Sequence, residues 1–323
     1  MVLIISRNSD LSTNEVIFQL NELNESWIRI NENTEISISI SIKNREFILK
    51  KNGISYNIEE FKSIWFRKGG IFLNFLSNIN SLNYKIDSLS FNEFIFDELN
   101  SIENYLETEY FDKFVLGKPS LKKINKLNVL KTANLIGLDV PESVIIQTKE
   151  EIALFIKKCG RVITKPIFNN VRSMDPNYRY KMYTKEILLD DIIKLPNYFY
   201  PSLFQELIDK KFEIRTVYLK GIFYSMCIFS QINLNSSLDF RAGGFLSKLS
   251  SCNFKLPICI EDKLRALLLH YSIEFCSIDL IYGMDGKFYF LELNPFGQYA
   301  MVTKELNIAI ENRIALILSN IIN

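Results

Sequence analysis

The segment Asp279-Leu-Ile-Tyr-Gly-Met-Asp-Gly-Lys-Phe-Tyr-Phe-Leu-Glu-Leu-Asn-Pro295 is typical of two strands joined by a tight turn. Asp285-Gly286 predicts a two-residue type I′ turn, in which both central residues need a positive φ. The residues on either side are rich in aromatic and β-branched strand formers. Folding the chain back about this turn pairs Met284 with Lys287, which sets the register of the predicted hairpin.

This register carries Asp279 to a position opposite Glu292. Cross-strand partners place their Cβ atoms about 4.5–5.5 Å apart. Asn294 joins Glu292 on the same face, because residues two apart in a strand point the same way. Two carboxylates and one amide oxygen suit a hard cation whose other ligands are phosphate oxygens and water. The hairpin therefore predicts a Mg²⁺ site for a nucleoside triphosphate.

The composition is that of a folded chain of about two domains. The 323 residues are 48% hydrophobic, and the formal net charge of +1 argues against a nucleic-acid partner. No apolar run approaches the roughly 20 residues that span a bilayer, so no membrane partner is expected. Five scattered cysteines without a C-x-x-C pair, and no visible signal peptide, predict reduced thiols in a cytoplasm. The one histidine, His270, excludes multi-histidine metal sites and lies at a predicted helix surface.

Periodicity and capping signals predict alternating strands and helices along the chain. The expected helices start at caps on Ser12 or Thr13 (to Leu23), Ser90 (to Tyr110) and Ser120 (to Gly137), and cover Thr148–Cys159, Asp262–Tyr271 and Thr303–Ile322. The expected strands include Val2–Ile5, Trp27–Ile30, Ile36–Ile42, Phe47–Lys50, Ile54–Asn57, Ser63–Arg67 and Val144–Ile146. Asn52-Gly53 and Lys220-Gly221 predict further hairpins.

The order of the polar residues in the second half predicts a nucleotide site built from separate segments. Lys165 offers a point charge to phosphate oxygens. Gln205 or Glu206 can accept the adenine amino group, while the Leu207 backbone reads the ring edge. The site is completed by Glu213, which can accept from ribose hydroxyls, and Arg215, which can hold a carboxylate or acyl phosphate bidentately.

The sequence contains neither a G-x-x-x-x-G-K-[ST] loop nor a G-x-G-x-x-G loop. Phosphate must therefore be held by lysines, by the metal and by the polar segment 168–183. Lys126 is a further candidate, although it lies beside Lys122 and Lys123, and a solvated basic helix face is the alternative interpretation.

These motifs together resemble the ATP-grasp ligases. The residues that carry the resemblance are Lys126, Lys165-Pro166, Gln205-Glu206-Leu207, Glu213-Ile-Arg215, Asp279 and Glu292-Leu-Asn294. Finer features are similar to the peptide maturases of microviridins and related graspetides: Ile64-Trp65-Phe66-Arg67, Ser237-Leu-Asp239-Phe240-Arg241 and Asn294-Pro-Phe-Gly297-Gln298. The opening of the chain, with Ser12-Thr-Asn-Glu15 and Arg29-Ile-Asn31, most resembles the grasp-with-spasm maturases.

The resemblance implies an α/β (α+β) chain with the ATP-grasp fold. Residues 1–117 would form an N-terminal α/β pre-ATP-grasp domain, which the resemblance assigns to leader contact. Residues 118–200 would form the central ATP-grasp subdomain, and residues 201–323 the C-terminal subdomain with the Mg²⁺ and ATP site. One departure is that the stretch after Lys165-Pro166 lacks the glycine richness of many ATP-grasp enzymes.

The implied activity is that of an ATP-dependent macrocyclase. Such an enzyme phosphorylates Asp or Glu side chains of a ribosomal precursor peptide, and Ser or Thr hydroxyls or Lys amines of that peptide then displace the phosphate. By motif match, Lys126 and Lys165 would bind ATP phosphates, whereas Asp279, Glu292 and Asn294 would hold Mg²⁺. The two arginines Arg215 and Arg241 would steady the acyl phosphate and the acidic substrate. A leader segment of the precursor and a second copy of the chain, as a homodimer, are the implied partners.

Two other functions fit the same motifs. One is an ATP-grasp ligase that joins small amino acids or adds glutamate to a protein terminus. The other is a non-catalytic protein that binds nucleotide or leader peptide, against which the complete set of metal ligands argues.

Overall fold

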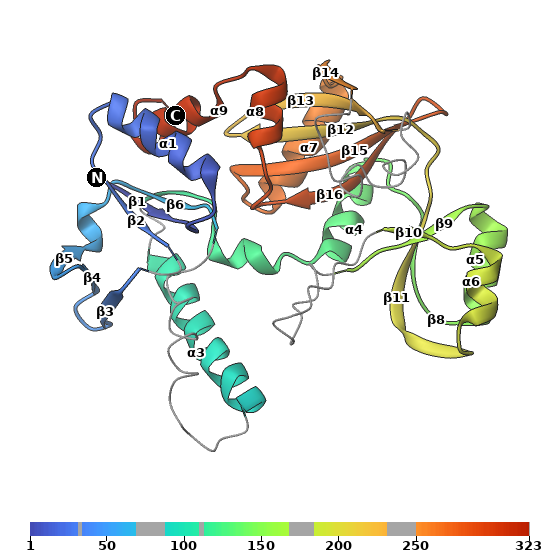
Figure 1. The fold of residues 1–323 in the computed structure, drawn as a ribbon, viewed down its shortest axis with the longest axis horizontal. Coiled ribbons are helices and arrows are strands. Elements are labelled where there is room, and N and C mark those ends of the chain that lie inside the picture. The colour runs from blue at the N-terminus through green and yellow to red at the C-terminus, as the bar shows by residue number, and fades with distance from the viewer. Residues whose placement is uncertain (32–33, 69–87, 110–112, 168–183, 231–249, 323) are drawn as a thin grey trace. The chain divides into compact units, whose positions relative to one another are not determined.

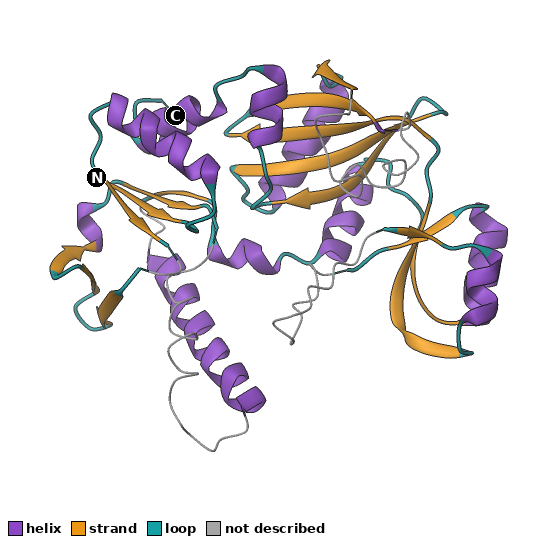
Figure 2. Ribbon diagram, viewed as in Figure 1, coloured by secondary structure: helices purple, strands orange, loops and turns teal. Residues whose placement is uncertain are grey.

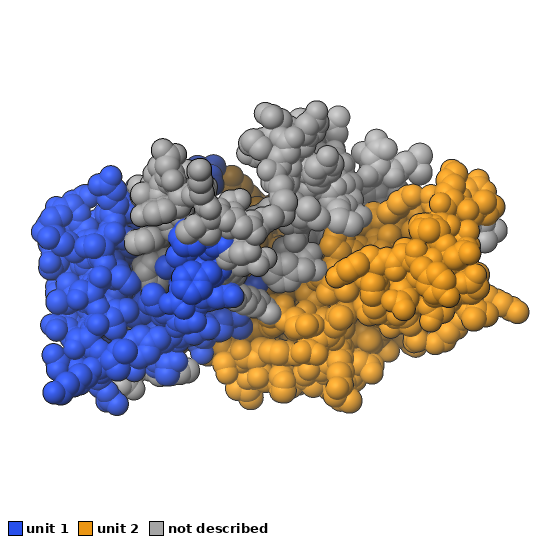
Figure 3. Space-filling model, turned by 90° about the horizontal axis from the view of Figure 1, so that it is seen from below, with its two compact units in different colours: residues 1–123, 307–323 blue, residues 124–306 orange. Residues whose placement is uncertain are grey.

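The computed structural model describes residues 1–31, 34–68, 88–109, 113–167, 184–230 and 250–322. They form two compact units, drawn in blue and orange in Figure 3. Unit 1 contains residues 1–123 and 307–323, and unit 2 contains residues 124–306. The sequence grouped 307–323 with the preceding strands, whereas the structure places this segment in unit 1. The division into three functional segments stays a prediction.

Unit 1 contains a parallel sheet with strand order β2-β1-β6-β7. Figure 1 labels β1, β2 and β6 of this sheet. Its strands are β1 Val2–Ile5, β2 Trp27–Ile30, β6 Ser63–Phe66 and β7 Phe114–Leu116. A second, antiparallel sheet contains β3 Ile36–Ser41, β4 Glu46–Lys51 and β5 Ile54–Asn57, followed by a short 3₁₀ turn at Ile58–Glu60. The helices are α1 Leu11–Glu22, α3 Ser88–Glu109 and α9 Ile310–Leu318, and a second 3₁₀ turn covers Pro119–Lys123. The strands were largely predicted because their apolar pattern is continuous or alternating.

The start of α1 differs from the prediction. Asp10, and not Ser12 or Thr13, is the N-cap residue, and its side chain makes no capping hydrogen bond. The Asp10 carboxylate instead pairs with Arg67 Nε at 3.1 Å, and both side chains are almost completely buried. Burial alone would raise the pKa of Asp10, but Arg67, the Ser12 hydroxyl and Lys68 outweigh it and hold that pKa below its usual value. The partner Arg67 is distant in sequence, so local capping signals could not reveal this arrangement.

Unit 2 contains two sheets, each with helices beside it. Figure 2 shows the strands in orange and the helices in purple. The smaller sheet has the order β10-β9-β11-β8, with β8 Ser143–Thr148, β9 Val162–Thr164, β10 Lys185–Glu186 and β11 Tyr198–Glu206. Helices α5 Lys149–Cys159 and α6 Leu189–Lys194 pack on it around a core that includes Ile152, Phe155 and Phe204. The larger, antiparallel sheet has the order β14-β13-β12-β15-β16. Its strands are β12 Lys210–Leu219, β13 Ile222–Phe229, β14 Ser250–Phe254, β15 Phe275–Gly283 and β16 Phe288–Asn294.

The remaining helices of unit 2 are α4 Lys126–Ile136, α7 Ile258–His270 and α8 Ala300–Leu306. Helix α4 begins later than predicted, because Asn125 Oδ1 accepts hydrogen bonds from Leu127 N and Asn128 N and starts a new helix after the 3₁₀ turn. Its predicted end at Gly137 is confirmed. The single helix predicted for 303–322 is wrong, since Asn307 has a positive φ of 53° and separates α8 from α9. Within the described residues, no helix is long and apolar enough to cross a membrane.

Candidate functional site

The hairpin of β15 and β16 pairs Asp279 directly with Glu292, and Ser277 with Asn294, which confirms the predicted register at the candidate metal ligands. The predicted two-residue type I′ turn at Asp285-Gly286 is wrong. Gly283 N donates to Lys287 O at 2.9 Å, so the loop has three residues, and Met284 does not pair with Lys287. Of these loop residues only Gly286 has a positive φ, of 81°. A turn followed by a left-handed glycine is the usual form of such a three-residue loop.

A β-bulge restores the predicted register. Next to the turn, Tyr282 pairs with Phe288 and Leu280 with Phe290. The pairing then shifts between Asp279 and Leu280, which leaves Leu291 as the extra residue of β16. Bulges often lie beside functional sites, where they redirect the neighbouring side chains.

Both carboxylates of the hairpin have basic partners from elsewhere in unit 2. Lys126 Nζ, at the first residue of α4, lies 3.2 Å from Glu292 Oε2. Arg215 lies on β12 directly opposite Asp279 of β15, and its guanidinium forms an ion pair with the Asp279 carboxylate. The structure therefore brings together four of the predicted site residues in two neighbouring ion pairs.

The guanidinium of Arg215 is oriented by contacts that the sequence did not suggest. Its Nη2 donates to Ser277 Oγ at 2.9 Å and to the Gln298 carbonyl at 3.3 Å. Ser277 is buried and lies opposite Asn294. A Cβ at Gly297 would overlap the Ser277 hydroxyl, so the absence of a side chain at 297 makes room for this contact. The only signal in the sequence was the glycine three residues after Asn294.

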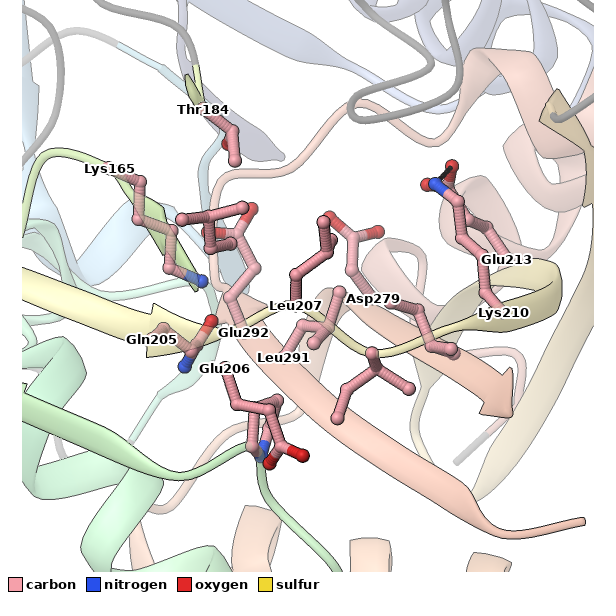
Figure 4. Close-up of a pocket in the computed structure, with 14 residues that line it drawn as sticks. Lys165, Thr184, Gln205, Glu206, Leu207, Lys210, Glu213, Asp279, Leu291 and Glu292 are labelled. Atoms are coloured by element: carbon pink, nitrogen blue, oxygen red, sulfur yellow. Dashed lines mark hydrogen bonds and ion pairs between the residues drawn. The ribbon is translucent and has the colours of Figure 1, made fainter. Parts of the chain in front are cut away.

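A hollow opens beside these residues, between the small and the large sheet of unit 2. Figure 4 shows Lys165 and Gln205 on one side of it, Lys210 and Glu213 on the opposite side, and the two hairpin carboxylates between them. Thr184 also contributes to its lining.

The strand end at 205–208 offers hydrogen-bonding groups to this hollow. Gln205 is buried, and its Nε2 donates to Ser143 Oγ at 2.8 Å, which fixes the side-chain amide and leaves its oxygen as an acceptor. Leu207 N donates to Arg161 O at 2.9 Å, so this N–H is engaged within the protein. Ile208 also lines the hollow, and its N–H has no hydrogen bond to the described part of the chain. As a donor to a flat ring edge, Ile208 N is therefore better suited than Leu207 N, whereas the prediction named the Leu207 backbone without specifying the atom.

Glu213 is held by two donors on one oxygen. Lys210 Nζ and Ser230 Oγ each lie 2.6 Å from Glu213 Oε1. No partner of Oε2 occurs among the described residues, so this oxygen can accept from a ligand hydroxyl. Lys210, the first residue of β12, was not singled out from the sequence, because an isolated lysine near a strand end is usually solvated.

The other predicted site residues either have a partner within the protein, lie beside the hollow without lining it, or fall outside the described residues. Glu206 lines the hollow, but its carboxylate accepts from Glu142 N at 3.3 Å. Asn294, Arg215 and Lys126 do not line the hollow within the described part of the chain and lie next to residues that do. Arg241 and the segment 168–183 lie outside the described residues. In the described ranges, no three His, Cys, Asp or Glu side chains cluster in a way that could hold a metal. The predicted set has only two such side chains, because its third ligand, Asn294, is an amide.

The chain matches no family model, and no curated protein matches its sequence. Its structure, in contrast, is similar over its full length to solved ATP-grasp ligases. The RiPP-associated ATP-grasp ligase of Chryseobacterium gregarium, solved with ADP and a leader and core peptide, matches with a TM-score of 0.85 and 23% identity. This match covers 100% of the chain and 97% of that protein.

Two further structures extend the comparison. The macrocyclase MdnC of Microcystis aeruginosa, bound with precursor peptide MdnA, matches with a TM-score of 0.80 and 22% identity over 99% of this chain and 100% of that one. The D-alanyl-alanine synthetase A of Vibrio cholerae matches with a TM-score of 0.61 and 12% identity, over 99% and 97% of the two chains. The chain therefore has the ATP-grasp fold, which confirms the predicted fold class.

Proposed function

We propose that the chain is an ATP-dependent peptide ligase of the graspetide-maturase type. It phosphorylates Asp or Glu side chains of a ribosomal precursor peptide and joins them to Ser or Thr hydroxyls or to Lys amines. The products are macrolactone or macrolactam links. The carrying observation is the pair of carboxylates, Asp279 and Glu292, held by Arg215 and Lys126 beside the hollow between the two sheets of unit 2. The likeness to ligases solved with leader, core and precursor peptides supports a peptide substrate.

The residues on the hollow divide the work of binding ATP. Gln205 Oε1 accepts from the adenine amino group, and Ile208 N donates to the ring edge. Glu213 Oε2 accepts from a ribose hydroxyl, while Lys210 holds the other oxygen of Glu213 in place. Lys165 and Lys126 attract the phosphates with point charges.

The donor set fits a magnesium ion. The carboxylates of Asp279 and Glu292 are direct cross-strand partners, and the Asn294 amide follows on the same face of β16. These residues would hold Mg²⁺, which when bound neutralises negative charge on the phosphate oxygens.

The chemistry then requires positioning and charge stabilisation more than an enzyme nucleophile. An oxygen of the substrate carboxylate attacks the terminal phosphorus of ATP, and ADP leaves. The hydroxyl or amine of the same peptide then attacks the acyl carbon and gives up a proton to water or to the departing phosphate, which leaves with the bond electrons. Arg215, with Nη2 fixed by Ser277, directs its remaining N–H groups to the acyl phosphate. Arg241 is proposed for the acidic substrate on its motif alone.

The test is to incubate the protein with Mg²⁺, ATP and a short peptide encoded beside its gene that is rich in Thr, Ser and acidic residues. We expect the peptide to lose one water per ring while ADP and phosphate appear. ADP release with free amino acids and an unchanged peptide would support the small-amino-acid ligase instead. Nucleotide binding without turnover under either condition would support the non-catalytic alternative.

We further propose a cytoplasmic homodimer that recognises a leader segment. Five scattered cysteines without a C-x-x-C pair fit a reducing compartment. Light scattering of the purified chain, alone and with the precursor, tests the oligomeric state directly.

A further inference from the structure

Two of the five cysteines face each other on neighbouring strands of unit 2. Cys227 on β13 is the Cα partner of Cys252 on β14, although the two lie 25 positions apart in the sequence. Their Sγ atoms are 2.9 Å apart. We propose that Cys227 and Cys252 form a modification site, a dithiol that oxidises reversibly to a cross-strand disulfide.

The backbone already has the geometry that such a bridge needs. Directly opposed residues of antiparallel strands have Cα atoms about 4.5–5.5 Å apart, and disulfides join Cα atoms about 4.4–6.8 Å apart. The sulfur atoms have to close only to about 2.05 Å. A small rotation of the two side chains therefore forms the bond without a change of strand register.

The two thiols differ in a way that suits a sequential reaction. Cys252 is exposed on the edge strand β14, whereas Cys227 is 2% exposed. Burial, together with the hydrogen bond between the two thiols, raises the pKa of Cys227 to about 11. Cys227 therefore stays protonated at neutral pH, and an oxidant from solution meets Cys252 first.

With hydrogen peroxide as the oxidant, the step balances. The Cys252 thiolate attacks one peroxide oxygen, which gives a sulfenic acid and hydroxide. The Cys227 sulfur then displaces the sulfenic oxygen and forms the S–S bond, while its proton leaves with that oxygen as water. Two electrons pass from sulfur to peroxide, and a dithiol reductant reverses the reaction by exchange.

The other cysteines lack this arrangement. Cys159, Cys259 and Cys276 have no cysteine as a strand partner, and Cys276 is completely buried. All five cysteines lie within the described ranges, and among them Cys227 and Cys252 are the pair that the structure shows as strand partners with their sulfur atoms in contact.

The bridge lies on the face of the sheet opposite the candidate nucleotide site. Met226 and Ile228, the neighbours of Cys227, pair with Arg215 and Glu213. Since successive strand residues point to opposite faces, the Cys227 sulfur points away from both site residues. Oxidation therefore ties the edge strand β14 to β13 and stabilises unit 2 without closing the hollow.

The test uses the full chain, treated stepwise with hydrogen peroxide, alkylated and mapped by mass spectrometry without reduction. We expect a linked pair of peptides containing Cys227 and Cys252, and a rise in Tm of roughly 5 °C that dithiothreitol reverses. Cys252→Ser abolishes the link, whereas Cys259→Ser, a change at another exposed cysteine, leaves it intact.

The proposal is overturned if Cys227 remains open to alkylation after Cys252 is fully oxidised, if Cys252 links to Cys259, or if the linked chain melts at the same temperature as the reduced one. None of these measurements involves ATP turnover. Failure here is therefore distinct from failure of the proposed ligase activity.

Discussion

Lys126 Nζ lies 3.2 Å from Glu292 Oε2, so a helix start and a strand end that are distant in the sequence meet at the candidate metal site. Together with the pair of Arg215 and Asp279, this contact balances two carboxylates with two cations. A divalent ion on the carboxylates would take over this neutralisation. The two basic side chains would then be available for phosphate oxygens.

Glu292→Gln tests the carboxylate pair. The substitution keeps the size and hydrogen-bonding shape of the side chain but removes its charge, so we expect kcat/KM to fall by about 10²-fold or more. Tm should change little, because Glu292 is only partly buried and its partner Lys126 is 30% exposed. Glu274→Gln, on an exposed residue before β15, is the matched control. Retained turnover in Glu292→Gln would remove this residue from the site.

Lys126→Met tests the phosphate contact. Loss of a charged hydrogen bond corresponds to roughly 1.5–3 kcal/mol, so KM for ATP should rise about 10-fold or more while the melting temperature is unchanged. Lys131→Met, an exposed position on the same helix, should leave KM as it is. An equal rise in both variants would indicate a general charge effect of α4 and not a contact of Lys126.

Ser277→Ala tests whether the orientation of Arg215 matters. The hydroxyl accepts from Arg215 Nη2, and we expect its removal to lower kcat about 10-fold with little change in KM for ATP. Ser225→Ala removes a similarly buried hydroxyl that pairs with Thr216 instead. The control should lower stability to a similar degree but preserve kcat. Equal effects on kcat would mean that Ser277 acts through packing alone.

Adenine contacts can be probed with altered nucleotides. If Ile208 N donates to the N1 atom of the ring, 1-deaza-ATP should bind about 10-fold more weakly than ATP, because the donor loses its acceptor. 3-Deaza-ATP keeps N1 and serves as the control. Calorimetric titration of both analogues measures the difference, and equal affinities would exclude this contact.

Because of Asp10, we expect the stability of unit 1 to fall in acid. The pKa of Asp10 in the folded state is held below its usual value near 3.8. Burial raises this pKa, but the charges of Arg67 and Lys68 and the hydrogen bond from Ser12 lower it by more. A depressed carboxyl pKa stabilises the fold fully above about pH 4 and loses this contribution as pH falls through the folded-state pKa. Asp10→Asn should cost about 3–5 kcal/mol, because it removes the negative charge that Asp10 places beside the buried Arg67 guanidinium.

The measurement is the free energy of unfolding followed from pH 6 to pH 2 by denaturant titration, in the chain and in Asp10→Asn. The variant should show a smaller loss of stability on acidification. An identical pH dependence in the two proteins would show that other carboxyl groups control acid unfolding.

Much of the candidate site was predictable because its residues are separated by short, regular intervals. The pairing of Asp279 with Glu292 followed from strand alternation and a strong turn signal, although the turn has three residues and the bulge at Leu291 compensates for the difference. The two hairpin carboxylates and Glu213 were all chosen from local patterns. Arg241 lies outside the described residues, so its role stays a prediction.

What the sequence could not indicate is which distant groups meet. Ser277, Lys210 and Ile208 carry no local signal, since a buried serine, a lysine at a strand end and a backbone N–H occur in any sheet. Their roles arise only when the small and large sheets of unit 2 enclose one hollow.

By itself, the sequence determined the strand and helix periodicity, the hairpin that aligns two acidic residues and the order of nucleotide-binding motifs, because these depend on neighbours within a few positions. Only the tertiary structure decided which cation faces which carboxylate, where the last helix packs and that Cys227 meets Cys252. The physical reason is that side-chain contacts depend on through-space distances of a few ångströms. The number of residues between two positions does not give the distance between their side chains once the chain has folded into a sheet.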